Sequence, residues 1–321
     1  MSGRTPGIGT KGVYIHIPYC RQACRYCDFY FTVSLKYADL FVDCLIGEIR
    51  QRGSAEAKEI PGSSSSGNDR IGSLYLGGGT PSLLSGSQLF QIVEAVREVF
   101  HLSPDAELTI ECNPDDLYPG KLNEWRNLGF NRLSIGVQSF FGADLELLRR
   151  SHHEQQARDA VLAAYGAGFD NLTLDLIYGI PGQSMERWRK NLEQATELPV
   201  SHLSAYHLTF EPGTVFEHWR KKGRIAPVPE EQSMECFSIL RNHMENLGFE
   251  HYEISNFARP GMQSRHNLVY WTGEPYLGFG PSAHSYDGSR RRWNIASLRK
   301  YMEGIRGGKE IHEQEILSPA D

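Results

Sequence analysis

Short apolar runs alternate with longer amphipathic segments along the first two thirds of the chain. The short runs predict six strands, at residues 13–17, 74–76, 107–111, 132–137, 172–178 and 202–208. Amphipathic spacing predicts helices between them, for example at 37–52, 86–100, 155–167 and 186–197. Strand–helix units in series favour a parallel sheet with outer helices, so the pattern predicts an α/β fold whose sheet either stays open or curls into a barrel.

The alternation weakens after about residue 211. A helix is predicted at 230–246, and the Gly-, Tyr- and Trp-rich stretch 251–293 has little periodicity. We therefore divide the chain into an N-terminal tail (1–12), a strand–helix domain (13–229) and a smaller α+β region (230–321). Residues 58–72 contain a run of serines and are expected to form a surface loop. No convincing last element precedes residue 321, so we expect a truncated sequence.

The composition narrows the class of protein. The 321 residues carry a net charge of −6, with 40% hydrophobic and 22% charged residues, which suits an ordinary core and predicts no nucleic-acid partner. The sequence shows no signal peptide and no apolar run long enough to span a membrane. Three of the six cysteines are clustered and three are scattered, which is not a disulfide framework. We therefore expect a cytoplasmic protein in a reducing environment.

The clustered cysteines, Cys20, Cys24 and Cys27, lie on one tight loop after the first predicted strand. Thiolates are the soft ligands that iron–sulfur clusters require, and a four-iron cluster with three protein thiolates keeps one iron open for a small molecule. Two alternatives are a zinc site with His16 as fourth ligand and simple burial as small apolar side chains. Zinc sites usually draw on paired ligands from separated knuckles, and this chain has no second pair, so the pattern favours a cluster.

Further polar residues fall where the predicted strands end. They are Gly77 to Pro81 after the second strand, Glu111 at the end of the third, Gln138 after the fourth and Asp175 in the fifth. Consecutive glycines allow a close approach to a ligand, and a carboxylate ending an apolar strand needs donors such as ribose hydroxyls or an ammonium group. Arg150 could bind a carboxylate with two hydrogen bonds. Taken singly, each of these residues is more often structural, but their convergence on one rim predicts a site.

A second distinctive run extends from His266 to Trp271. A histidine beside aromatic rings is suited to ligate haem iron. A packed or hydrogen-bonded histidine is the alternative, and from composition alone it is the commoner one. His284, in a Gly-rich turn nearby, is a weaker candidate.

Together these motifs resemble the radical S-adenosylmethionine superfamily. Within it the chain is similar to the branch that contains haem chaperones and oxygen-independent coproporphyrinogen III dehydrogenases. The likeness extends from about residue 13 to about residue 293. It rests on Tyr14 to Cys20, the cysteine loop, Gly77 to Pro81, Gly136 to Ser139, Asp175 to Pro181 and His266 to Trp271.

The resemblance implies a partial (β/α)6 barrel. It also implies a [4Fe–4S] cluster on Cys20, Cys24 and Cys27, with S-adenosylmethionine chelating the fourth iron. By motif position, the cofactor pocket would be lined by Tyr14, Tyr26, Gly78, Gly79, Thr80, Glu111, Gln138, Arg150 and Asp175, with Thr209 as a weaker match.

Two departures distinguish the branches. Coproporphyrinogen dehydrogenases typically carry another cysteine where this chain has Phe29, and they have a longer arm before the first strand. The run from His266 to Trp271, in contrast, matches the haem chaperones. The resemblance thus implies a haem chaperone that binds haem through His266 and transfers it to apo-haemoproteins such as respiratory-chain components. It also implies an electron donor such as flavodoxin or ferredoxin, and it allows a homodimer.

The alternative is an enzyme of porphyrin biosynthesis. Its reduced cluster would cleave S-adenosylmethionine to a 5′-deoxyadenosyl radical, which would drive oxidative decarboxylation of coproporphyrinogen III. A zinc-stabilised binding module is a third possibility. Whether the chain is an enzyme is therefore left open by the sequence.

Overall fold

The computed structural model describes residues 11–59 and 70–317. Six parallel strands lie side by side in chain order, as the alternation predicts. They are β1 (Lys11–Ile17), β2 (Ile71–Gly78), β3 (Leu102–Cys112), β4 (Arg132–Gln138), β5 (Asn171–Tyr178) and β6 (His202–His207). The α/β prediction is confirmed. Most of the expected loop at 58–72 lies outside the described residues.

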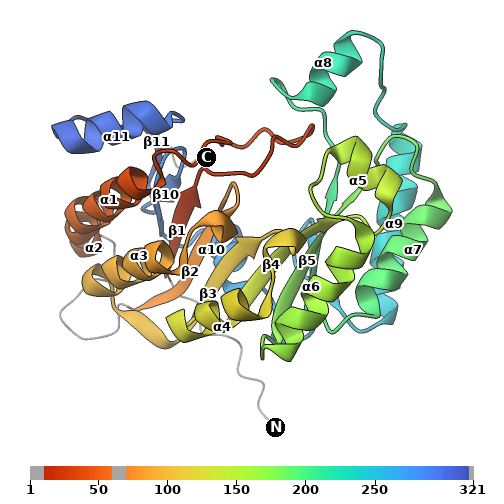
Figure 1. The fold of residues 1–321 in the computed structure, drawn as a ribbon, viewed down its shortest axis with the longest axis horizontal. Coiled ribbons are helices and arrows are strands. Elements are labelled where there is room, and N and C mark those ends of the chain that lie inside the picture. The colour runs from red at the N-terminus through yellow and green to blue at the C-terminus, as the bar shows by residue number, and fades with distance from the viewer. Residues whose placement is uncertain (1–10, 60–69, 318–321) are drawn as a thin grey trace.

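Helices cover the outer face of these strands (Figure 1). They are α1 (Ala38–Glu48), α3 (Gly86–Val99), α4 (Pro119–Leu128), α5 (Gly142–Leu148), α6 (Glu154–Gly166), α7 (Met185–Thr196) and α9 (Glu230–Asn246). Helix α3 shows why the sequence forms them: Ser85 and Gln88 make a capping box at its start, and Leu89, Ile92 and Val96 bury one face at helical spacing. Short helical turns η2 (Pro81–Leu83) and η3 (Pro114–Asp116) follow β2 and β3.

Helix α8 (Val215–Lys221) projects from the body beside α5, and the loop after β1 crosses the top of the sheet toward it (Figure 1). Helix α10 (Arg265–Thr272) packs against β1 and β2. Within the described residues, no helix is both long enough and apolar enough to cross a bilayer.

Later strands extend the same sheet at both edges. In the described part of the chain the order is β12-β11-β10-β9-β1-β2-β3-β4-β5-β6-β8-β7. The added strands are β7 (Glu250–His251), β8 (Asn256–Ala258), β9 (Tyr276–Phe279), β10 (His284–Tyr286), β11 (Arg290–Asn294) and β12 (His312–Ile316). Strand β9 runs parallel to β1, and β8 runs antiparallel to β6.

The chain does form a last element, contrary to the sequence prediction. Helix α11 (Leu298–Gly307) buries Leu298, Tyr301 and Met302, and β12 follows it as the edge strand beside β11. The sequence of β12 is His-Glu-Gln-Glu-Ile, and its side chains are largely exposed. A polar edge strand has no apolar alternation, so its pattern could not predict it.

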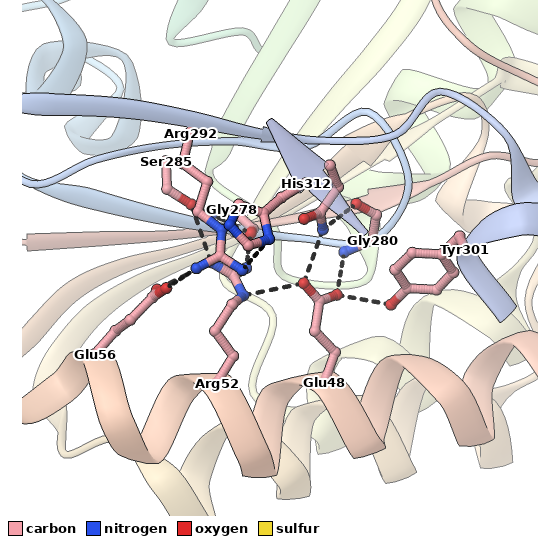
Figure 2. Close-up of polar contacts among 10 residues, drawn as sticks. Glu48, Arg52, Glu56, Gly278, Gly280, Ser285, Arg292, Tyr301 and His312 are labelled. Atoms are coloured by element: carbon pink, nitrogen blue, oxygen red, sulfur yellow. Dashed lines mark hydrogen bonds and ion pairs between the residues drawn. The ribbon is translucent and has the colours of Figure 1, made fainter. Parts of the chain in front are cut away.

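The single helix predicted at 37–52 is interrupted. Helix α1 ends at Glu48, a wider π-helical turn η1 (Ile49–Gly53) follows, and helix α2 (Ser54–Glu59) continues. Gly53 lies against Phe100, where a Cβ atom would come within 2.9 Å of the ring. Across this turn Glu48 and Arg52 both face the strands β9 to β11 (Figure 2).

Glu48 is the centre of a buried polar cluster that joins α1 to the C-terminal strands (Figure 2). Its carboxylate accepts hydrogen bonds from Arg52 Nε (3.0 Å), Asn294 Nδ2 (2.7 Å), Gly280 N (2.9 Å) and Tyr301 OH (2.7 Å). Arg52 also binds the carbonyl oxygen of Gly278. The side chains of Glu48 and Arg52 are 2% and 9% exposed, so neither charge has water as an alternative partner.

Replacing Glu48 with alanine is expected to lower the free energy of unfolding by about 3–5 kcal/mol, because its buried donors lose their shared acceptor and Arg52 keeps only Glu56 as a carboxylate partner. Glu98→Ala is the matched control: Glu98 pairs with Arg50 at 2.7 Å, but both side chains are more than half exposed, so the loss should stay below about 1 kcal/mol. Urea midpoints of the two variants would test this. Equal losses would contradict the role given to the buried cluster.

Candidate functional site

The carboxyl ends of the parallel strands surround a cavity of about 410 Å³. The loop after β1, the ends of β2 to β5 and the segment after β6 contribute to its wall. Most of the predicted cofactor residues line it: Cys20, Cys24, Tyr26, Cys27, Gly78, Gly79, Thr80, Glu111, Gln138, Arg150, Asp175 and Thr209. Tyr14 and His266 do not; they line a second cavity.

The cysteine loop is closed at its base by backbone hydrogen bonds. Cys20 N donates to Thr32 O (2.9 Å), and Thr32 N donates to Pro18 O (2.6 Å). All three thiols are free and line the cavity. Burial is the main cause that raises the pKa of Cys20 to about 11 and the pKa of Cys27 to about 12. At neutral pH these two groups therefore keep their protons until a metal centre displaces them.

The arrangement of these sulfurs suits a cluster. In the part of the chain that the structure describes, no three His, Cys, Asp or Glu side chains converge as ligands of a metal ion. All three cysteines line the same cavity. A cubane presents different irons to different sulfurs, so its ligands surround it rather than meet at a point. Three soft donors around one cavity fit a [4Fe–4S] cluster on chemical grounds.

Arg25 fixes the middle of the cysteine loop against the rest of the protein. Its backbone N–H donates to Leu148 O (3.2 Å), and its Nη1 donates to the carbonyl oxygens of Glu146 and Leu147 (3.1 Å each). These carbonyls lie at the C-terminal end of α5, where helix carbonyls lack partners and a cation is favourable. The guanidinium also stacks over Trp219 of α8, 4.8 Å from the ring centroid. Helices α5 and α8 thus hold the loop from one side.

Two side chains donate hydrogen bonds toward the sulfurs. Thr80 Oγ1 lies 3.7 Å from Cys20 Sγ, and Arg150 Nη1 lies 3.5 Å from Cys24 Sγ. Arg150 is itself positioned by Asn113, whose Oδ1 accepts from Nη2 at 2.5 Å. Asn113 was not identified from the sequence, although its place directly after β3 put it on the same rim. Donors of this kind stabilise sulfur once it carries negative charge.

The glycine turn after β2 packs against the start of the cysteine loop. Gly78 has φ +105°, and a Cβ atom there would lie 2.5 Å from the His16 ring. A Cβ atom at Gly79 would lie 2.6 Å from Tyr19 O, and Gly79 N donates to Ile17 O (2.9 Å). The glycines thus allow the ends of β1 and β2 to meet closely, and Gly78 and Gly79 also line the cavity.

Two partly buried carboxyl groups also line the cavity. Glu111 accepts hydrogen bonds from Tyr75 OH (2.8 Å) and Gly78 N (3.0 Å), and Asp175 accepts from Ser134 Oγ (3.2 Å). Burial, more than any other cause, raises the pKa of Glu111 to about 7 and the pKa of Asp175 to about 6. Both remain able to accept hydrogen bonds from hydroxyl or ammonium groups. Tyr75 was not identified from the sequence, because it reads as an ordinary strand residue.

Gln138 has a strained backbone at the end of β4. Its φ is +66°, in the left-handed region that residues other than glycine rarely adopt. Such strain costs about 1–3 kcal/mol and is concentrated at functional sites. Gln138 lines the first cavity at the rim position that the sequence predicts. Tyr26, in the cysteine loop, accepts a hydrogen bond from Arg150 Nη1 (3.4 Å).

His266 lies in the second cavity, on the inner helix α10. It is 1% exposed, and both ring nitrogens have partners: Nδ1 is 2.9 Å from Ser73 Oγ, and Nε2 is 2.9 Å from Tyr270 OH. Its ring stacks on those of Tyr75 and Tyr14, with centroids 5.1 and 6.1 Å away. Burial lowers the pKa of His266 to about 3, so the ring is neutral. Iron ligation would require one of the two hydrogen bonds to break.

The aromatic residues that follow His266 in the run from His266 to Trp271 are more exposed to solvent. Tyr270 and Trp271 are 44% and 55% exposed, and His284 is an exposed residue stacked on Trp293. The partner of His266 Nε2 is therefore a partly exposed side chain whose hydroxyl group reaches the interior. The structure separates the two predicted histidines, His266 in the interior and His284 on the surface.

Comparison with known proteins identifies the family. Residues 14–195 match the model of the radical SAM superfamily. The heme chaperone HemW of Bacillus subtilis (strain 168) is 38% identical over 92% of this chain and 76% of its own length. HemW of Escherichia coli (strain K12) is also 38% identical, over 96% of this chain and 79% of its own length.

A solved structure supports the same grouping. The radical SAM enzyme coproporphyrinogen III oxidase (HemN) from Escherichia coli matches with a TM-score of 0.81 and 26% identity, over 97% of this chain and 73% of that chain. The sequence identity to the HemW proteins is higher than the identity to HemN. The chain belongs to the radical SAM superfamily and, within it, to the HemW family.

Proposed function

We propose that this protein is a haem chaperone, which binds haem and transfers it to apo-haemoproteins such as respiratory-chain components. The observation that carries the proposal is the placement of the cysteine loop and the His266 motif on two cavities that share walls, in a chain 35–40% identical to proteins named heme chaperones. Because the two cavities have wall residues in common, a ligand bound in one cavity can influence binding in the other. In this proposal the protein acts in the cytoplasm, accepts electrons from a donor such as flavodoxin or ferredoxin, and can act as a homodimer.

The residues of the first cavity have distinct parts in this proposal. Cys20, Cys24 and Cys27 would hold the [4Fe–4S] cluster, which together with S-adenosylmethionine supplies one-electron chemistry when bound. Thr80 and Arg150 would steady the charged sulfurs through the hydrogen bonds described above. The carboxyl groups would accept hydrogen bonds from the ammonium and ribose groups of the cofactor. Gly78, Gly79, Gln138, Tyr26 and Thr209 complete the pocket.

The second cavity supports haem binding through His266, with Tyr14 stacked on its ring. The ring is neutral, as a ligand of iron must be. Movement of the half-exposed Tyr270 would free Nε2 without disturbing the bond to Ser73, which would then hold the ring in orientation. Tyr270 is therefore the side chain expected to move when haem binds.

The alternative, oxidative decarboxylation of coproporphyrinogen III, is not favoured. The chain is more similar to HemW proteins than to HemN, and it has Phe29 in place of the extra cysteine. The test is direct. Anaerobically reconstituted protein should shift the Soret band of added haem and should form no protoporphyrinogen from coproporphyrinogen III, S-adenosylmethionine and reductant. Protoporphyrinogen formation would favour the enzyme instead.

His266→Ala is expected to weaken haem binding by at least about tenfold, equivalent to about 1.4 kcal/mol, because the iron loses its protein ligand. The dissociation constant is read from the Soret band during haem titration. His284→Ala serves as the control, since His284 is exposed and lies outside the second cavity. If both variants bind haem as tightly as the wild type, His266 is not the ligand.

A further inference from the structure

The second cavity has a volume of about 340 Å³ and is lined by residues of α10 and of the parallel strands. Its wall shares Phe29, Glu111, Ser134, Asp175 and Tyr206 with the first cavity. The residues of interest here line the second cavity only: Arg132, Thr173, His202, Ser264 and His266. The cavity thus has one end beside the cofactor pocket and another beside Arg132.

Arg132 is a buried cation without a carboxylate partner in the described residues. The residue is 2% exposed, at the start of β4. Its guanidinium donates to Asn171 Oδ1 (2.5 Å), Thr173 Oγ1 (2.5 Å) and Met262 O (3.5 Å), all of them neutral acceptors. A guanidinium stays charged at any physiological pH, and a buried charge normally has a counter-ion. The Asp175 carboxyl group of the same cavity feels this charge, which acts to lower its pKa, but no carboxylate of the described residues forms an ion pair with Arg132.

His202 adds an unpaired hydrogen-bond donor to the same wall. It is fully buried, and its Nε2 lies 2.7 Å from Tyr252 OH. Tyr252 OH accepts a hydrogen bond from Ser264 N (3.3 Å) and can donate its own proton to His202 Nε2. Nδ1 then carries the ring proton, and this buried atom has no partner. Burial and the nearby Arg132 lower the pKa of His202 well below 6.5, so the ring stays neutral.

The carboxyl groups of the cavity lie toward its other end. Asp175 is two residues beyond Thr173 along β5, about 7 Å nearer the cofactor pocket. Its carboxylate is already bound by Ser134, and that of Glu111 by Tyr75 and Gly78. Both also line the first cavity, whereas Arg132 does not. The charge of the second cavity is therefore divided, with the positive end farthest from the cysteine loop.

We propose that the second cavity binds a carboxylate group at Arg132, with the Nδ1–H of His202 as an additional donor. This inference rests on the proposed haem-chaperone function for its source of carboxylate, which is a propionate of haem. His266 and Arg132 line the same cavity, so one ligand could contact the histidine through its iron and the arginine through its side chain. A free small carboxylate is the other source of the same chemistry.

The experiment compares haem with haem dimethyl ester, in which both propionates are esterified, and adds sodium propionate as a separate probe. Wild-type protein should bind haem at least about tenfold more tightly than the ester, since a buried charge pair would be lost. Sodium propionate should raise the melting temperature of the haem-free protein relative to sodium chloride at equal ionic strength. It should also weaken the binding of haem but not that of the ester.

The Arg132→Met variant tests the positive charge alone, because it removes the guanidinium group and leaves the other residues of the site unchanged. In this variant haem and the ester should bind with affinities within about twofold of each other, and the propionate effect should disappear. Arg126→Met is the matched control: Arg126 is exposed on α4, over Phe169, and outside both cavities. It should keep the wild-type preference for haem.

The outcomes are distinct. Equal binding of haem and ester by the wild type, together with no propionate effect, would overturn the carboxylate site. Failure to bind either porphyrin would overturn the haem-chaperone function, and the propionate measurement would then decide on the Arg132 site alone. If Arg132→Met does not fold, the wild-type measurements still give the answer.

Discussion

The Cys24→Ala protein is expected to take up almost no iron or sulfide under anaerobic reconstitution. Cys24 is one of three thiols around the first cavity, and its sulfur lies 3.5 Å from Arg150 Nη1. With two thiolates remaining, a cubane would have two irons without a protein ligand, and metal binding by thiolates depends on the full ligand set. The measurement is iron and labile sulfide per chain, together with the charge-transfer absorbance of the cluster.

Cys44→Ala and Cys236→Ala are the controls for this result. Both residues are buried on helices away from the cysteine loop, with Cys44 in α1 and Cys236 in α9. They should retain the iron and sulfide content of the wild type, with only the modest destabilisation of a small core truncation. A Cys24→Ala protein with a full cluster, or controls that lose it equally, would contradict the assignment of the loop.

Lowering the pH below 6.5 is expected to destabilise the protein strongly, because several histidines are buried in the neutral form. Burial lowers the pKa of His16 to about 4 and the pKa values of His152 and His266 to about 3, from 6.5 in the unfolded chain. The unfolded state therefore binds more protons between about pH 6.5 and pH 4. The contribution of these neutral histidines to the free energy of unfolding is fully present above pH 6.5. It falls as the pH is lowered, by about 1.4 kcal/mol per pH unit for each histidine.

Two carboxyl groups oppose this trend. The pKa values of Glu111 and Asp175 are raised to about 7 and about 6, so the folded state holds their protons more tightly than the unfolded state does. Their contribution to stability increases as the pH falls from about 7 to about 4. Three histidines against two carboxyl groups still leave a net loss of stability on acidification, and His202 adds to it.

His152→Gln isolates one histidine from the others. The glutamine amide can replace His152 Nε2 as the donor to Val137 O (3.0 Å) but does not titrate. The slope of unfolding free energy against pH, from urea titrations between about pH 6.5 and 4.5, should decrease by about 1.4 kcal/mol per pH unit relative to the wild type. His153→Gln, at an exposed helix start, is the matched control for replacing a histidine outside the core. Identical slopes in all three proteins would mean that His152 is not held neutral by burial.

The rim of the first cavity was predictable because strand ends carry its residues. In a parallel sheet the carboxyl ends meet at one edge, so the sequence alone predicts that Glu111, Gln138 and Asp175 lie together, and they do line one cavity. The six central strands were predictable for a related reason: buried parallel strands appear as continuous apolar runs. What these residues bind remains a prediction.

The second cavity could not be predicted in this way. Arg132 and His202 each begin a strand, where a polar residue usually marks the strand boundary and faces solvent. Helix α10 packs against β1 and β2, and residues of all three elements line the second cavity together with Arg132 and His202. That packing depends on contacts between segments more than 100 residues apart, such as His266 with Ser73, which periodicity along the chain does not encode.

The most direct test of the haem-chaperone function is haem transfer from the anaerobically reconstituted protein. Haem-loaded protein is mixed with an apo-haemoprotein of the respiratory chain, and recovery of the acceptor's spectrum is followed over time. We expect faster transfer than from free haem at the same concentration, and loss of that advantage in His266→Ala. Transfer no faster than from free haem would contradict the chaperone function.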